Sequence, residues 1–257
     1  MMPDWNVAAG NSKKMPASLL GVGITQRLND AVPLDLVFRN SQGNAVRLAD
    51  YFGSKPVILS LVYYTCPMLC PLEEDGLLQS LKLMRFTAGK QFNIVTVSFN
   101  PHDTPQIAAK KKKLYLSEYD RKAAAHGWFF LTGSQASIAA LTQAVGFHYR
   151  YDPQTHTFAH AVALMVLTPQ GKLADYFYGI KYAPGNLRLA LVEGSHDKIG
   201  SPVDEMILYC YRYNPVSGKF DLVISRVLFA GGALMLLTIG GLVVILSRGS
   251  RHHASAA

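Results

Sequence analysis

Two adjoining stretches decide the fold: residues 56–64, PVILSLVYY, and residues 66–71, CPMLCP. The first is a continuous apolar run of β-forming side chains, which is typical of a central strand buried on both faces. Beyond the second stretch, leucines recur with helical spacing as far as Met84. A buried strand that leads into a helix favours an α/β fold, with both cysteines at the carboxyl end of a central strand.

Alternating strand and helix patterns extend outward from this core. We expect strands at residues 34–39, 92–99, 128–131, 158–167 and 173–178, the last two forming a hairpin. We expect helices at residues 104–125, 134–145 and 184–193. This alternation predicts a central sheet with helices on both faces.

Composition limits the kind of protein. The chain has 257 residues, of which 49% are hydrophobic and only 16% charged, and this excludes an intrinsically disordered protein. Three cysteines are too few for a disulfide-stapled scaffold but enough for a redox pair or one metal site. The net charge of +8 is compatible with nucleic acid or an anionic membrane surface. The four lysines at 110–113 lie in a predicted helix without interleaved aromatic residues, so we interpret them as a solvated face and expect no nucleic-acid partner.

A membrane span is expected near the C-terminus. Residues 227–246, VLFAGGALMLLTIGGLVVIL, carry no charge, and about 20 helical residues cross the hydrocarbon core of a bilayer. The alternative is a long buried core helix. The basic tail after the span favours a cytoplasmic C-terminus, which would place the large N-terminal part on the periplasmic or extracytoplasmic side. The first 30 residues show no signal-peptide pattern, so the route of export stays open.

These patterns divide the chain into five segments. We expect a flexible N-terminal segment at 1–30, a folded α/β domain at 31–204, a β-ribbon linker at 205–226, the transmembrane helix at 227–246 and a basic tail at 247–257. The third cysteine, Cys210, lies in the ribbon. It is either a buried, unpaired side chain or a third thiol near the site.

Cys66 and Cys70 are the first candidates for chemistry. We expect a helix to begin at this motif, and a helix N-terminus stabilises a thiolate and lowers the pKa of Cys66. The spacing of four residues predicts that both side chains lie on one helical face. Two such thiols can form a disulfide or bind a soft metal ion such as Cu(I) or zinc. The alternative is a pair of reduced core cysteines.

Here the sequence resembles the Sco/SenC family of copper proteins, over roughly residues 30–195. The CPMLCP stretch matches the family's C-P-x-x-C-P pattern. Residues 97–105, VSFNPHDTP, resemble V-S-x-D-P-x-x-D-T-P, and residues 130–133 match F-L-T-G. The resemblance implies a thioredoxin-like fold and copper as the cofactor. It also implies that Cys66, Cys70 and His160 are the metal ligands.

The chain departs from the family pattern around these residues. Ala159 and Ala161 flank the histidine where the family usually has Asp and Ser or Thr, Asn100 replaces an Asp, and Met68 stands where Asp is frequent. We therefore expect fewer polar groups to orient His160. Four other histidines compete for the role, with His156 as the runner-up. They are His102, His126, His148 and His156.

Three functions remain open at this stage. The resemblance implies a membrane-anchored copper chaperone that assists copper-site assembly in cytochrome c oxidase, with oxidase subunit II as the partner. A thiol-disulfide oxidoreductase without a copper role, working through Cys66 and Cys70 with a thiol-reductase partner, is the main alternative. The third is a redox or copper sensor.

Overall fold

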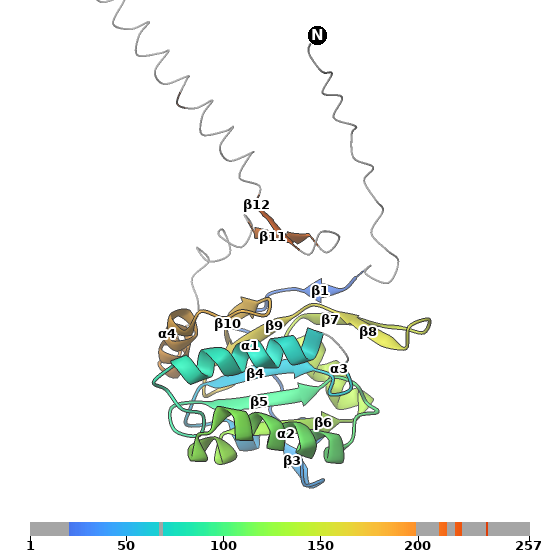
Figure 1. Cartoon of the computed structure of the whole chain (residues 1–257), viewed down its shortest axis with the longest axis horizontal. Coiled ribbons are helices and arrows are strands. Elements are labelled where there is room, and N and C mark those ends of the chain that lie inside the picture. The colour runs from blue at the N-terminus through green and yellow to red at the C-terminus, as the bar shows by residue number, and fades with distance from the viewer. Residues whose placement is uncertain (1–20, 67–68, 199–210, 215–218, 223–234, 236–257) are drawn as a thin grey trace, which may run out of the picture. The chain divides into compact units, whose positions relative to one another are not determined.

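A computed structural model describes residues 21–66, 69–198, 211–214, 219–222 and 235. The chain divides into two compact units, residues 1–200 and 201–257, and each is considered by itself. In the first unit, the fold begins before residue 31, because Gly23–Ile24 (β1) pairs with a later strand, β7. Figure 1 shows the elements of this unit.

A seven-stranded sheet forms the centre of the first unit, in the order β10-β9-β4-β5-β6-β2-β3. Its bounds in chain order are β2 Val37–Arg39, β3 Ala45–Arg47, β4 Val57–Val62, β5 Asn93–Ser98, β6 Trp128–Gly133, β9 Ala163–Leu167 and β10 Leu173–Tyr178. The strands β4, β5 and β6 are parallel, and all the other pairs in the sheet are antiparallel. The predicted mixed α/β architecture with a central sheet is confirmed.

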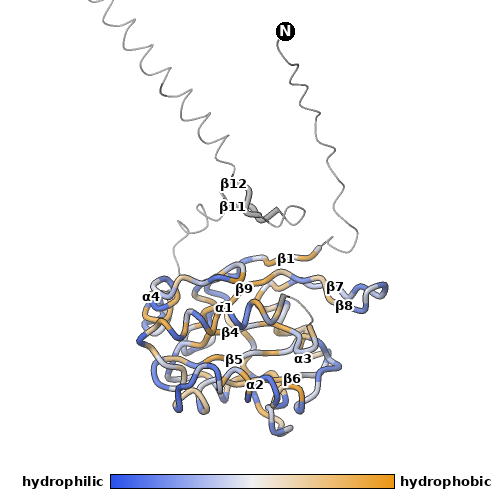
Figure 2. The backbone as a smooth tube through the Cα atoms, in the orientation of Figure 1, coloured by the Kyte–Doolittle hydropathy of each residue, from blue (hydrophilic) through white to orange (hydrophobic). Residues whose placement is uncertain are grey.

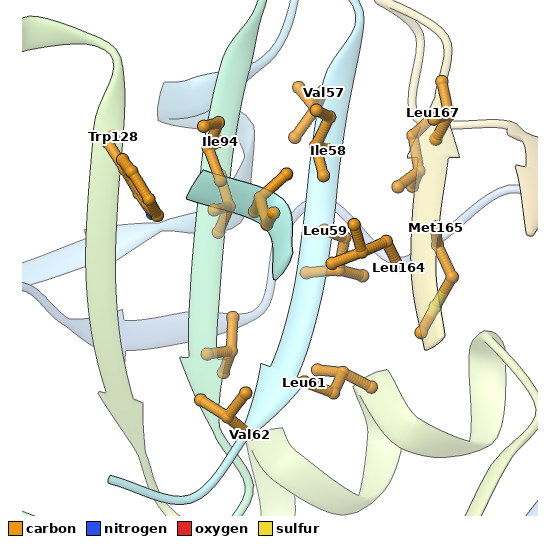
Figure 3. Close-up of a cluster of buried hydrophobic side chains, with 14 of the residues drawn as sticks. Val57, Ile58, Leu59, Leu61, Val62, Ile94, Trp128, Leu164, Met165 and Leu167 are labelled. Atoms are coloured by element: carbon orange, nitrogen blue, oxygen red, sulfur yellow. The ribbon is translucent and has the colours of Figure 1, made fainter. Parts of the chain in front are cut away.

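The strand β4 is buried along its whole length, as its apolar run predicts. Leu59 pairs with Val95 of β5 on one side and with Met165 of β9 on the other. Figure 3 shows these strands with their buried apolar side chains. Burial of apolar surface stabilises the fold by about 25 cal/mol per Å². It therefore holds β4 in place, and with it the end of the strand after which Cys66 follows.

Helices flank the sheet, also as predicted. Leu69–Leu83 (α1) connects β4 to β5, and Pro105–Tyr119 (α2) connects β5 to β6. Because both crossovers step in the same direction along the sheet, α1 and α2 cover one face, in front of the strands in Figure 1. Pro184–Ser195 (α4) packs beside α1, whereas Gln135–Ala144 (α3) packs against β6 and β7.

The helix predicted at 104–125 is shorter than expected. Thr104 caps α2 by accepting a hydrogen bond from the backbone N–H of Ile107, but the helix ends at Asp120, which has a left-handed φ of 50°. A separate short 3-10 helix, η3 (Lys122–His126), follows. On α2, Lys110 and Lys113 are exposed, whereas Lys112 is half-buried with its ammonium 5.7 Å from the centre of the Phe129 ring.

The single strand predicted at 158–167 is wrong, because the structure splits it in two. Thr157–His160 (β8) pairs with Phe147–Asp152 (β7) in a small sheet of order β1-β7-β8, while β9 joins the main sheet. The hairpin of β9 and β10 forms as expected. The tip between β7 and β8 is hydrophilic in Figure 2, and the strands bring His160 toward the end of β4. The split therefore places the histidine at the site.

In the second unit, the described residues other than Met235 form one ribbon. Tyr211–Asn214 (β11) pairs with Lys219–Leu222 (β12) in antiparallel register, where the sequence predicts strands. Among the described residues, no helix is long and apolar enough to cross a membrane. Apart from Met235, the predicted span at 227–246 lies outside the described residues, as does Cys210.

Candidate metal centre

The two cysteines lie where β4 gives way to α1. Cys66 belongs to the connecting loop, and Cys70 is the second residue of α1. The described part of α1 begins at Leu69, and residues 67–68 lie outside the described residues, so the arrangement of both side chains on one helical face stays a prediction. The loop is held by two backbone contacts: the N–H of Cys66 donates to the carbonyl of Tyr63 over 3.0 Å, and that of Cys70 faces Cys66 Sγ at 3.5 Å.

The imidazole of His160 comes from the last residue of β8. Its Nδ1 donates a hydrogen bond to the carbonyl oxygen of Ala161, 2.7 Å away, so Nε2 carries the lone pair. Nε2 lies 3.5 Å from Cys70 Sγ. The backbone thus orients the ring, although Ala159 and Ala161 bring no polar side chains. A histidine whose second nitrogen is fixed in this way is prepared to act as a ligand.

The three donor atoms converge on one point. The Sγ atoms of Cys66 and Cys70 and a ring nitrogen of His160 all lie within 4.8 Å of one another. Donors around a bound ion at bond lengths of roughly 2.0–2.3 Å lie about 3–4 Å apart, so only small movements separate this arrangement from a coordination shell. Both cysteines are buried and His160 is half-buried.

Aromatic rings surround the imidazole. The ring centres of Phe99, Tyr63 and Phe147 lie 5.1, 5.8 and 6.1 Å from that of His160. Phe99 follows β5 and Tyr63 follows β4, so the ends of the parallel strands supply two of the three rings. These rings exclude water from one side of the site, and sequence reasoning did not identify them. Their position just beyond two buried strands was the available signal.

Comparison with protein-family models gives one match. The model described as SCO1/SenC matches residues 25–187, which is more than half of the chain. The chain belongs to the SCO1/SenC family.

Solved structures share the fold of the chain. A putative electron transfer protein from Aquifex aeolicus is 29% identical, with a TM-score of 0.59, and the match covers 66% of this chain and 95% of that one. Arabidopsis thaliana ScoI with copper bound is 19% identical (TM-score 0.51, 66% and 99% covered). BsSco, titled a member of the Sco family of cytochrome c oxidase assembly proteins, is also 19% identical (TM-score 0.50, 67% and 97% covered). No curated protein matches the chain.

The Cys70 thiol of this SCO1/SenC protein is held neutral when no metal is present. A hydrogen bond with Cys66, followed by burial, raises the pKa of the Cys70 thiol above its ordinary range. Burial, followed by a hydrogen bond with Cys66, likewise raises the pKa of the Tyr63 hydroxyl. A cation held between the two sulfurs would replace thiol protons, so metal binding is coupled to proton release.

The donor set fits a soft ion. Thiolate and imidazole ligands favour Cu(I) or zinc over hard cations, and three protein donors suit Cu(I) better than a structural zinc ion, which usually has four. Cys66, Cys70 and His160 would hold the ion. Across the described residues, these three form the one cluster of this kind.

The competing histidines lie elsewhere. His102, His126, His148 and His156 are all exposed, and the metal cluster includes none of them. His156, the runner-up, faces the hydroxyl of Tyr151 across 3.0 Å, and His148 faces Thr25 across 3.2 Å.

Two buried glutamates lie on α1 three and four residues after Cys70. Glu73 and Glu74 are almost completely inaccessible, and Ser60 Oγ lies 3.1 and 2.7 Å from their Oε1 atoms. The other oxygen of each carboxyl group, Oε2, has no hydrogen-bond partner. Thr96 Oγ1 also donates to Glu74 Oε1 over 3.5 Å, and burial raises the pKa of both carboxyl groups. Glutamate side chains near the start of a helix are usually exposed to solvent, so the sequence did not predict that Glu73 and Glu74 are buried.

Proposed function

We propose that the protein is a copper-binding chaperone that assists copper-site assembly in cytochrome c oxidase. The observation that carries the proposal is the convergence of Cys66, Cys70 and His160 within 4.8 Å. Membership of the SCO1/SenC family supports copper as the cargo, as does the copper bound in the Arabidopsis relative. The similarity to BsSco, a member of the Sco family of cytochrome c oxidase assembly proteins, supports oxidase assembly as the process.

Oxidase subunit II is the proposed acceptor of the copper. A groove of about 630 Å³ borders the site and gives an acceptor a route to it. Tyr63 and Phe158 line this groove, and their rings lie 5.3 Å apart, while Tyr63 also touches His160. Handover by ligand exchange needs an incoming thiolate or imidazole to reach the ion as one of the three donors leaves. A bordering groove lets a single loop of the acceptor do this without unfolding the site.

A membrane anchor at residues 227–246 completes the proposal. The anchor would keep the domain beside a membrane-bound acceptor and raise its effective concentration without new contacts. The domain would face the periplasmic or extracytoplasmic side, with the basic tail in the cytoplasm. The support is the uncharged 20-residue run and the basic residues that follow it.

Replacing His160 tests the three-ligand site. We expect His160→Ala to weaken Cu(I) binding by more than the roughly 10- to 100-fold that loss of a ligand's hydrogen-bond partner costs. Competition with a chromophoric Cu(I) chelator measures the affinity. His156→Ala is the matched control, since it removes an exposed imidazole from the same hairpin and leaves the affinity unchanged. Equal affinity of His160→Ala and wild type contradicts the proposed site.

Thiol–disulfide exchange is the second candidate function. The closeness of the Cys66 and Cys70 sulfurs, which lie within 4.8 Å of each other, favours it, because disulfide formation requires the two sulfurs to meet. His160→Ala separates the two candidates: it abolishes tight copper binding yet leaves exchange between Cys66 and Cys70 largely intact. A wild-type protein that exchanges disulfides but does not bind copper would establish this second function instead.

A further inference from the structure

A buried carboxylate ties the cysteine loop to the neighbouring strand. Asp103 is 6% exposed and lies beyond the end of β5. Its Oδ2 accepts hydrogen bonds from the backbone N–H of Tyr64 and from the hydroxyl of Ser98, both over 2.6 Å. Its Oδ1 accepts from Thr65 Oγ1 over 3.1 Å and from Asn100 Nδ2 over 3.2 Å.

These four donors belong to two different segments. Tyr64 and Thr65 are the two residues immediately before Cys66, whereas Ser98 and Asn100 belong to the end of β5 and the turn that follows. Asn100 Nδ2 also faces Thr65 Oγ1 at 3.3 Å, which adds a direct link between the segments. The carboxylate therefore joins the loop that carries Cys66 to the rigid centre of the sheet.

No basic side chain balances this charge. Within the described part of the chain, Arg27–Asp30 is the one ion pair, so the four donor dipoles alone compensate Asp103. A buried carboxylate is costly unless its hydrogen bonds are all made, and this cost resists any movement of the loop that breaks one of them. Cys70 lies in α1 and His160 in β8, whereas Tyr64 and Thr65 directly precede Cys66, so the carboxylate acts most directly on Cys66.

We propose that Asp103 is a positioning residue that fixes the Cys66 sulfur for metal binding by clamping residues 64 and 65 to the end of β5. The part of this inference that concerns Cu(I) affinity rests on the proposed function. The part that concerns the reactivity of the Cys66 thiol does not. Without the clamp, the loop opens locally, and Cys66 leaves the position at which it can share an ion with Cys70 and His160.

The test is Asp103→Asn in the full chain. The variant keeps the side-chain size but puts an NH₂ group where one carboxylate oxygen accepts two hydrogen bonds. In the reduced, metal-free protein we expect iodoacetamide to alkylate Cys66 about tenfold faster, with Cys70 as the internal reference and peptide mapping to separate both from Cys210. The Cu(I) dissociation constant is expected to rise about 10- to 100-fold.

Two further variants keep the test decisive if Asp103→Asn does not fold. Thr65→Val and Ser98→Ala each remove one donor to the carboxylate, and both are expected to raise Cys66 alkylation to an intermediate extent. The matched control is Tyr176→Phe, which removes a buried hydroxyl that donates to Val145 and accepts from the N–H of Arg27. We expect it to lower stability while leaving Cys66 reactivity and copper affinity unchanged.

The outcomes separate this inference from the proposed function. Unchanged Cys66 reactivity in the folded Asp103 variant, or an equal increase in Tyr176→Phe, overturns the positioning role. Failure of the wild type to bind Cu(I) overturns the proposed function, while the alkylation rates still decide the role of Asp103.

Discussion

At the scale of single residues, the buried glutamates give the molecule a pH dependence. Burial raises the pKa of Glu74 from 4.5 to about 7. Below pH 4.5 the carboxyl is protonated in both the folded and unfolded states. As the pH rises from 4.5 to 7, only the unfolded state releases the proton, so the free energy of unfolding falls. Above pH 7 the loss is complete, on the order of 3 kcal/mol.

Glu74→Gln is therefore expected to stabilise the reduced, metal-free protein, and to do so more at pH 8 than at pH 5. The stabilisation should grow by on the order of 2 kcal/mol between these pH values. Urea denaturation at both pH values measures it. Asp75→Asn, on the exposed side of the same helix, is the control and should change stability by less than about 0.5 kcal/mol. A Glu74→Gln effect that is equal at both pH values contradicts this explanation.

Residue-level reasoning from the sequence identified the three donors but not their surroundings. The cysteines follow a strand whose apolar sequence predicts that it is buried, whereas His160 was assigned only through the family resemblance. Contacts such as Asn100 with Thr65 and Phe99 with His160 join residues that are 35 or more positions apart in the chain. Such contacts arise from sheet order, which local spacing does not reveal.

At the scale of elements, the well-predicted helices are those with strong end signals. The helix α3 begins after Ser134, which caps the N–H of Ser137, and stops before Gly146, whose φ is 63°. The break between β8 and β9 has no such signal, because neither Gly nor Pro interrupts the apolar run at 158–167. The position of the break is set by strand pairing, because β8 pairs with β7 and β9 pairs with β4.

The packing of α1 makes a prediction at this scale. A Cβ atom added at Gly76 would lie 1.9 Å from the carbonyl oxygen of Ile180, in the segment between β10 and α4. We expect Gly76→Ala to lower the free energy of unfolding by about 2 kcal/mol or more, although alanine favours a helix by about 1 kcal/mol. Chemical denaturation measures the change.

Gly185→Ala serves as the comparison for this prediction. Gly185 lies in the first turn of α4, and an added Cβ there meets nothing within 4 Å. This variant should be neutral or stabilising by up to about 1 kcal/mol. If both alanine variants are equally stable, the close approach of Gly76 to the Ile180 carbonyl does not limit the packing of α1.

At the scale of the whole molecule, the proposed anchor predicts how the protein partitions. The full chain is expected to stay with membranes in an alkaline carbonate wash, because a 20-residue apolar helix inserts effectively irreversibly. The double variant Leu236→Lys/Ile239→Lys places two charges near the middle of the span. Each costs about 2.5–3.5 kcal/mol in the bilayer, so this variant should be released.

The conservative pair Leu236→Val/Ile239→Val is the control and should remain with the membrane. The site lies in the separate unit of residues 1–200, so the lysine variant should bind Cu(I) as tightly as wild type. Protease added from the extracytoplasmic side should digest the N-terminal unit and spare a C-terminal tag. If the protease digests only the tag, the orientation is the opposite of the proposed one. If carbonate releases the wild type, the proposed anchor is wrong, whereas the proposed metal centre is unaffected.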